Sequence, residues 1–282
     1  MKKIIFYNFF IFLFFLFFLE GLVRILSLSN LLGINEELII KNSRPLAYKP
    51  NMESVIFGKV VFTDIHGFRV PSKNFKYLAK KSILIIGDST SYGVGIAEEN
   101  TFVGLIRKKF PEKNIYNASL AGHTINDHPL LLKKFENKLK FEKIIYFLNI
   151  NDIDGLSGKE KIQNLSTNDN NNINVSEKLK KYTILADINF YLRSKSALYV
   201  FMKSLVTDPS KNHFGKTYEN YLTENNLISY EKKLDEIFLD TKKKSTISVI
   251  ILPWEYQTRE HCSNEKLFLP QKFLKNYFSK NK

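Results

Sequence analysis

A small polar turn, Gly87-Asp88-Ser89, directly follows the continuous apolar run Ser82–Ile86. Such a run predicts a strand that is buried on both faces, and a turn at the carboxyl end of a buried strand can present a reactive side chain. We therefore expect the Ser89 hydroxyl to be a nucleophile. The turn is not a G-x-S-x-G elbow, because Ser91 stands where the second Gly is required, and it lacks the residues of a phosphate or dinucleotide loop. A Gly-Asp-Ser match alone also occurs in ordinary turns.

Two more polar turns follow the next two predicted strands. The strand expected over Ile115–Ala118 leads into Ser119–Gly122, and the strand over Ile144–Leu148 leads into Asn149–Asp152. The carboxyl ends of parallel strands meet at one edge of a sheet, where α/β proteins bind their ligands. All three turns are therefore expected at the same edge.

In this order and strand context, the three turns resemble the sequence blocks of the SGNH (GDSL-like) hydrolase superfamily. The resemblance covers roughly Ser82 to Trp254. It implies that Ser89 is the nucleophile, and that the Gly122 backbone N–H and the Asn151 amide join the Ser89 N–H as an oxyanion hole. Asn149 departs from the family pattern, which usually has Gly at this position.

The resemblance also implies a general base, a His from a carboxy-terminal D-x-x-H block. No D-x-x-H occurs in the 282 residues. Either the sequence is truncated or the base comes from elsewhere. His261, after the last predicted strand, is the best internal substitute. His123 could line the pocket but is poorly placed to accept the Ser89 proton, and His66, His128 and His213 are predicted to be surface or turn residues.

The amino-terminal segment predicts a membrane anchor. Residues 4–19 are almost entirely apolar and follow Lys2 and Lys3. A helix continued to Val23 would be about 30 Å long, the thickness of the hydrocarbon core. We expect an uncleaved single-pass helix in contact with membrane lipid, with the lysines inside and the catalytic domain on the outer side of the cell membrane. A cleaved signal peptide is the alternative, although its best site, Ser27–Ser29, is poor.

The chain is expected to have three parts: an anchor at 1–30, a connector at 31–80 that packs on the domain, and an SGNH-like domain at 81–282 with a helical insertion at about 154–244. The predicted fold is a three-layer α/β/α arrangement around a parallel, flavodoxin-like sheet. An Asn-rich loop is expected at 164–174. Helices are predicted from Asn100 or Thr101 to Pro111 and at 129–139, 196–205, 229–238 and 269–282, with a last strand at 246–252.

The expected function is the hydrolysis or transfer of an ester-linked acyl group through an acyl-serine at Ser89, without a cofactor or metal. Water as acceptor would make the protein an esterase. A sugar hydroxyl as acceptor would make it an O-acyltransferase. The resemblance favours cell-surface polysaccharide as the substrate, because anchored members of the superfamily often act on it. The alternative is a non-catalytic binding or scaffold protein that lacks its general base. The acyl group, the acceptor and the oligomeric state stay open.

Composition argues against two other kinds of site. The formal net charge of +14 is distributed along the whole chain, which is typical of a solvated surface and not of a nucleic-acid patch. The same distribution is compatible with binding to anionic polysaccharide or to phospholipid head groups. Cys262 is the only cysteine, so neither a disulfide framework nor a cysteine-based metal site is expected.

Overall fold

The computed structural model describes residues 2–26, 36–78, 81–156, 184–185, 187–241, 246–259 and 264–280. Its contacts divide the chain into two compact units. Unit 1 comprises Met1–Ile34, Ile56–Gly58 and Thr167–Pro209, and unit 2 comprises Asn35–Val55, Lys59–Ser166 and Ser210–Lys282. The predicted Asn-rich loop, the candidate base His261 and the candidate cleavage site all lie outside the described residues.

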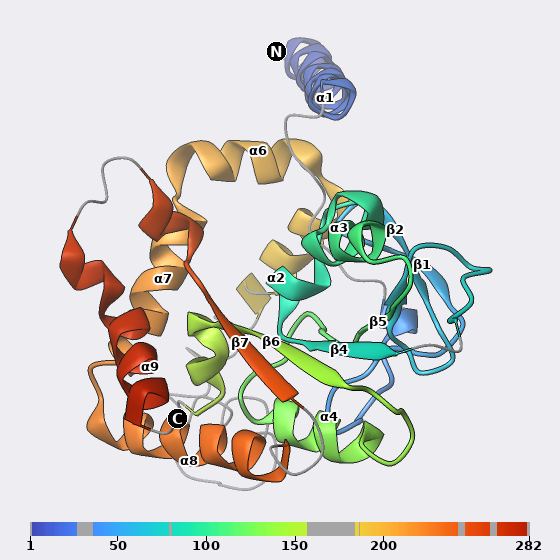
Figure 1. Cartoon of the computed structure of the whole chain (residues 1–282). Coiled ribbons are helices and arrows are strands. Elements are labelled where there is room, and N and C mark those ends of the chain that lie inside the picture. The colour runs from blue at the N-terminus through green and yellow to red at the C-terminus, as the bar shows by residue number, and fades with distance from the viewer. Residues whose placement is uncertain are drawn as a thin grey trace, which may run out of the picture. The chain divides into compact units, whose positions relative to one another are not determined.

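A mixed sheet of seven strands, in the order β1-β2-β3-β5-β4-β6-β7, forms the framework of unit 2 (Figure 1). Strands β4 to β7 pair in parallel, whereas β3 pairs antiparallel with both β2 and β5. The α/β class is confirmed, but the sheet is parallel only in its core and not throughout. The strands are β1 (Glu53–Ile56), β2 (Lys59–Thr63), β3 (Arg69–Val70), β4 (Ser82–Ile86), β5 (Asn114–Asn117), β6 (Lys143–Asn149) and β7 (Thr246–Leu252).

The central strand β4 is buried along its whole length. Successive side chains of a strand point to opposite faces. Ile83 and Ile85 belong to one apolar cluster, together with residues of α3 (Phe102–Lys109). Leu84 and Ile86 belong to a larger one, to which α4 (Asp127–Phe135), α8 (Glu224–Thr241) and α9 (Leu269–Lys280) contribute. Complete burial of one such side chain contributes about 1.5–3 kcal/mol.

Strands β1 to β3 come from the segment predicted to be a connector. They are short, and β3 has only two residues. Strand prediction depends on alternation or on an apolar run of at least four residues, whereas β1 and β2 contain only two and three consecutive apolar residues and left little signal in the sequence. This segment extends the sheet, because β3 pairs with β5.

The helices after the third parallel strand belong to both units. Besides α8, the structure contains α6 (Ala197–Val206) and α7 (Pro209–Asn220). Although α8 lies within the predicted insertion, its residues Tyr230, Leu234 and Ile237 are buried in the same cluster as β4. This helix is therefore a part of the main core.

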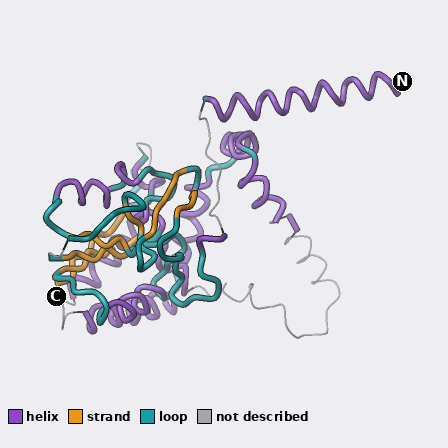
Figure 2. The backbone as a smooth tube through the Cα atoms, turned by 90° about the vertical axis from the view of Figure 1, so that its right-hand side faces the viewer, coloured by secondary structure: helices purple, strands orange, loops and turns teal. Residues whose placement is uncertain are grey.

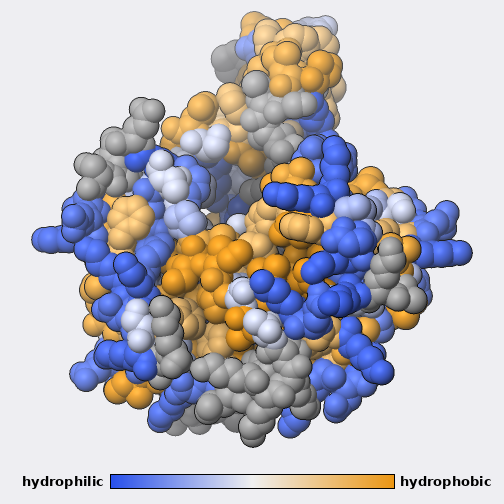
Figure 3. All heavy atoms as spheres, in the orientation of Figure 1, coloured by the Kyte–Doolittle hydropathy of each residue, from blue (hydrophilic) through white to orange (hydrophobic). Residues whose placement is uncertain are grey.

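The amino-terminal helix α1 (Lys2–Ile25) runs without a break (Figure 2). It is long and apolar enough to cross a membrane, and none of the apolar window that qualifies it is buried. Its surface is largely hydrophobic (Figure 3). Length and composition of this kind are also found in signal sequences.

The amino-terminal cap of α3 gives a stability prediction. The Thr101 hydroxyl accepts a hydrogen bond from the Gly104 N–H at 2.9 Å. Thr101→Ala should therefore lower the free energy of unfolding by about 1 kcal/mol, measured by urea denaturation in detergent. Thr101→Ser keeps the hydroxyl and should lose less. Asn100→Ala, at the exposed neighbouring position, should leave stability unchanged, and an equal loss in that variant would contradict the assigned cap.

Candidate active site

The predicted nucleophile lies on a tightly packed turn. Ser89 is half-buried and is the first residue of the short helix α2 (Ser89–Tyr92), which directly follows β4. A Cβ atom on Gly87 would lie 2.3 Å from the Ser91 hydroxyl oxygen and 2.8 Å from the Phe147 carbonyl oxygen. Only Gly fits at this position. Because the chain can pass so close to Ser91 and Phe147 here, Ser89 lies directly after the carboxyl end of the central strand.

Asp88, the middle residue of the motif, caps α2. It is almost completely buried, and its carboxylate accepts hydrogen bonds from the Thr90 N–H at 2.9 Å and from the Asn149 amide at 3.2 Å. A further hydrogen bond comes from the Asn151 side chain. Burial raises the pKa of Asp88, and the hydrogen bonds from Thr90 and Asn151 partly oppose that rise. Asp88 therefore connects the first turn to the third.

The second turn lies directly beside the first. The Leu120 N–H donates to the Gly87 carbonyl at 3.3 Å, and the Asn117 amide donates to the Ser91 carbonyl at 3.4 Å. Gly122, the predicted oxyanion donor, is exposed and has φ of +97°, a conformation that favours glycine. Any other residue at position 122 would therefore have a strained backbone conformation.

The third turn begins at Asn149 and continues through the helical turn η3 (Ile150–Leu156). Besides its bond to Asp88, the Asn149 amide donates to the Thr90 hydroxyl at 2.9 Å. The residue that departs from the family pattern thus joins two turns. Hydrogen bonds link all three turns that carry Ser89, Gly122 and Asn151, although none of these bonds is made by the Ser89 hydroxyl.

One prediction about the histidines is wrong. His128 is completely buried, and its Nδ1 lies 2.7 Å from the Tyr146 hydroxyl. This burial was not evident from the sequence, because a His next to Pro129 at the start of a helix is typical of a turn. His213 is exposed on α7, as expected, and His66 is half-buried against the rings of Phe68 and Phe135.

His123 is also buried, and its Nε2 lies 2.8 Å from the Leu46 carbonyl oxygen. With Leu46, Tyr48 and Ser119 it lines a small pocket beside the second turn. Ser89 and Asn151 are not among the residues that line this pocket. His123 thus lies next to the site without being directed at the nucleophile.

A buried polar chain runs from His128 through Tyr146 to Asp152. The Tyr146 hydroxyl donates to the Asp152 carboxylate at 3.1 Å, and the same hydroxyl lies 2.7 Å from His128 Nδ1. Burial raises the pKa of Asp152 well above its usual value, and the nearby charge of Asp88 raises it further. Burial likewise lowers the pKa of His128 to about 3. His128 is therefore a neutral, structural histidine.

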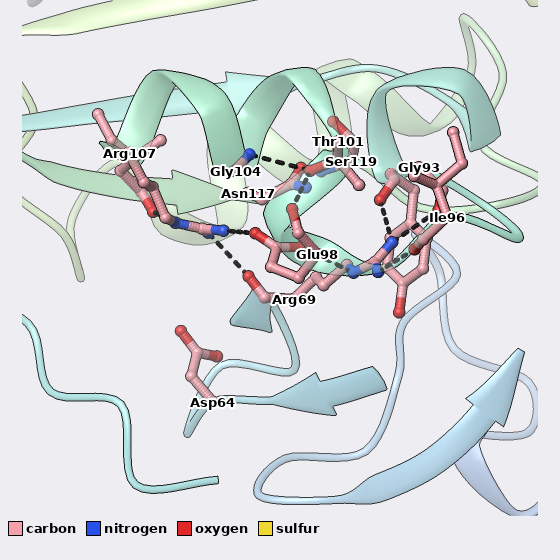
Figure 4. Close-up of polar contacts among 12 residues, drawn as sticks. Asp64, Arg69, Gly93, Ile96, Glu98, Thr101, Gly104, Arg107, Asn117 and Ser119 are labelled. Atoms are coloured by element: carbon pink, nitrogen blue, oxygen red, sulfur yellow. Dashed lines mark hydrogen bonds and ion pairs between the residues drawn. The ribbon is translucent and has the colours of Figure 1, made fainter. Parts of the chain in front are cut away.

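A buried cluster of charges holds the other end of α2 (Figure 4). The Arg69 guanidinium donates to the carbonyl oxygens of Tyr92 and Gly93, both at 2.7 Å, and forms an ion pair with Glu98 at 2.8 Å. Arg107 pairs with the same carboxylate and donates to the Arg69 carbonyl at 2.9 Å. Arg69 is only 1% exposed. Motif comparison missed this cluster because its residues are not part of the three turns.

Among the described residues, His, Cys, Asp and Glu side chains form no group of three or more that could hold a metal ion. No protein-family model matches the chain. No curated protein matches it either. The SGNH assignment is therefore supported by the three turns alone and stays a proposal.

The buried histidine gives a pH prediction. Since the pKa of His128 falls from 6.5 in the unfolded chain to about 3 in the fold, the unfolded chain binds the extra proton first as pH decreases. The contribution of His128 is complete above pH 6.5 and is lost progressively between pH 6.5 and about 3. At pH 5 the loss should be about 2 kcal/mol.

The measurement compares urea denaturation of the wild-type chain and of His128→Gln at pH 7.5 and pH 5. The buried carboxyl groups titrate in both proteins and cancel in the difference. The loss on acidification should be smaller in His128→Gln. Equal losses would contradict a neutral, buried His128.

Proposed function

We propose that this protein is an SGNH-type serine esterase or O-acyltransferase with Ser89 as nucleophile. The observation that carries the proposal is the hydrogen-bonded connection of three polar turns at the carboxyl ends of β4, β5 and β6, with Asp88 bonded to both α2 and the third turn. In an ordinary turn that has the sequence Gly-Asp-Ser by chance, there would be no reason for hydrogen bonds to the other two turns.

The proposed chemistry is acyl transfer in two steps. The Ser89 hydroxyl oxygen adds to the ester carbonyl and its proton goes to a general base. The carbonyl oxygen carries the negative charge until the alcohol leaves, and water or a sugar hydroxyl then takes the acyl group from serine. The backbone N–H groups of Ser89 and Gly122 and the Asn151 amide would stabilise that charge. One such donor typically contributes about 2.7–4 kcal/mol to the transition state.

The Asn151 amide can take this role while it is bonded to Asp88. A side-chain amide has two N–H groups, so one hydrogen bond to the carboxylate leaves a second donor. The bond also fixes the orientation of the amide. Preorganised donors stabilise developing charge without reorganising during the reaction.

The strand order is consistent with the flavodoxin-like, three-layer arrangement that we propose. Numbered along the chain, the four parallel strands lie in the order 2-1-3-4. In flavodoxin-like sheets, which begin 2-1-3-4, ligands bind between strands 1 and 3, where the order reverses. These strands are β4 and β6, which carry the turns of Ser89 and Asn151.

A non-catalytic binding protein is the second candidate, and the positions of the histidines favour it. His123 and His128 have ring nitrogens directed at Leu46 and Tyr146, and His66 and His213 lie against aromatic rings. If no base reaches Ser89, general-base assistance of about 10²- to 10⁴-fold is lost. The fold would then keep its pocket without efficient turnover.

We further infer that α1 is an uncleaved single-pass anchor, with Lys2 and Lys3 on the inner side and unit 2 on the outer side of the cell membrane. The apolar length of α1 and the basic residues at its start support this orientation. An anchored outer domain fits an acylated cell-surface carbohydrate as substrate. Nucleic acid is not a proposed partner.

The nucleophile is tested with a fluorophosphonate probe on the full chain. Attack by the Ser89 oxygen on phosphorus expels fluoride and leaves a covalent label. Labelling should occur in the wild type and be lost in Ser89→Ala. Ser91→Ala is the matched control, because this hydroxyl is two residues away and completely buried, and it should retain the label. Equal labelling of wild type and Ser89→Ala would reject the nucleophile.

The rate of p-nitrophenyl acetate turnover separates the two candidate functions. Without a base, we expect slow turnover, since binding and an oxyanion hole alone leave a rate about 10³- to 10⁴-fold above water in serine hydrolases. Asn151→Ala should lower that rate further. Brisk turnover that His261→Ala abolishes would identify His261 as the base, and no Ser89-dependent turnover or labelling would favour the binding protein.

The anchor is tested by membrane extraction. Because α1 has an apolar surface, the protein should stay in the membrane pellet after high-salt and carbonate washing, and detergent should release it. A soluble protein whose amino terminus lies near Asn30 would show that the segment is a cleaved signal peptide.

A further inference from the structure

Two short helices of unit 1, residues 187–195 and α6, meet at Ser196. The Tyr199 hydroxyl and the Lys203 ammonium group both donate to Asn189 Oδ1, at 2.9 Å and 2.5 Å. The Ser196 hydroxyl caps α6 by accepting from the Tyr199 N–H at 3.0 Å. These bonds join residues 187–206 into one element, which we call the helix pair.

The helix pair is bonded to the end of α1. The Glu20 carboxylate accepts from the Ser196 hydroxyl at 2.8 Å and from the next two backbone N–H groups at 2.9 Å. Arg24 donates to the Lys195 carbonyl at 2.7 Å. Val23 and Ala197 are almost completely buried where α1 and α6 are in contact. The helix pair is therefore fixed to one end of the apolar helix.

The helix pair exposes large apolar side chains, although it is bonded to α1. α6 is an apolar helix of only ten residues, too short to cross a bilayer. Exposed apolar side chains in such number mark a surface that contacts a partner or a membrane. At least half of the surface of each of these side chains is exposed: Ile188, Phe190, Tyr191, Met202, Leu205 and Val206.

We propose that the helix pair lies in the interfacial region of the same bilayer that α1 enters. The proposal rests on the anchoring of α1. From Lys3 to Glu20, the rise of the helix is about 26 Å, which places Glu20 near the edge of a hydrocarbon core of about 30 Å. The bonds of Glu20 and Arg24 thus hold the helix pair at the depth where amphipathic helices bind lipid.

Charge complementarity favours anionic phospholipid over a second copy of this basic chain. Arg193 and Lys195 precede the junction of α1 and the helix pair, where Arg24 is itself paired with Glu20. Basic residues next to an apolar surface are attracted to anionic headgroups, whereas two copies of this surface would repel one another. Tyr191 is exposed as well, and Tyr is enriched at the membrane interface.

The test uses a fluorescent label at single cysteines in the full chain, after Cys262→Ser. The labelled variants are Met202→Cys and Leu205→Cys in the helix pair, Phe12→Cys in α1 and Lys272→Cys in unit 2. Each protein is reconstituted into phosphatidylethanolamine–phosphatidylglycerol vesicles without quencher, with lipids that carry a quencher at a shallow acyl position, which reports on residues 202 and 205, and with lipids that carry it at a deep acyl position, which reports on residue 12. Unchanged thermal unfolding in detergent shows that the exposed substitutions leave the fold intact.

The emission of the labels at residues 202 and 205 should be lost on addition of quencher lipid, while the label at 272 keeps its emission. If only the label at residue 12 is quenched, α1 is anchored and the helix-pair proposal is wrong. Emission at 202 and 205 that is blue-shifted but not quenched would mean that a second copy covers this surface, which also overturns the proposal. An unquenched label at residue 12 would reject the anchor itself.

Discussion

The buried guanidinium of Arg69 is the interaction on which the geometry of the site most depends. Arg69 lies in β3, opposite Asn117 of β5, and its side chain binds the carbonyl oxygens at the end of α2. A charge this deeply buried needs a partner, which Glu98 provides together with Arg107. Removal of one member of such a cluster typically costs about 3–5 kcal/mol, because another charge stays buried and unpaired. The short strand β3 is therefore held in place by more than its few backbone bonds.

Asp88 has the corresponding role at the start of α2. Its carboxylate joins the nucleophile turn to Asn149 and Asn151, while Arg69 fixes the far end of the same helix. A four-residue helix has little stability of its own, because so few of its backbone groups are bonded within it. The position of Ser89 is thus determined by two buried polar groups from outside α2. The proposed reaction requires donors in fixed positions, and these buried bonds supply contacts that can hold them.

Much of the sheet core was predictable from the sequence, because β4 is a continuous apolar run, β7 is rich in β-branched residues, and Thr101 is a standard helix cap. The three turns could also be found, since each follows a predictable strand. The strands β1 to β3 could not, because they contain neither polar–apolar alternation nor an apolar run of at least four residues. Nor could the burial of His128 be predicted, since it depends on Tyr146, which is distant in sequence and becomes a neighbour only in the folded sheet.

The bond between Glu20 and α6 has a consequence for the order of events during synthesis. The Glu20 carboxylate and the Leu198 N–H that it accepts from are 178 residues apart. At about 5–20 residues per second, the ribosome needs roughly 10–35 s to make the intervening chain. During that time, Arg24, one helical turn away, can pair with the charge of Glu20. The Glu20–Arg24 ion pair can form as soon as α1 is made. Glu20 keeps this pair when α6 is made later and donates its backbone hydrogen bonds to the same carboxylate.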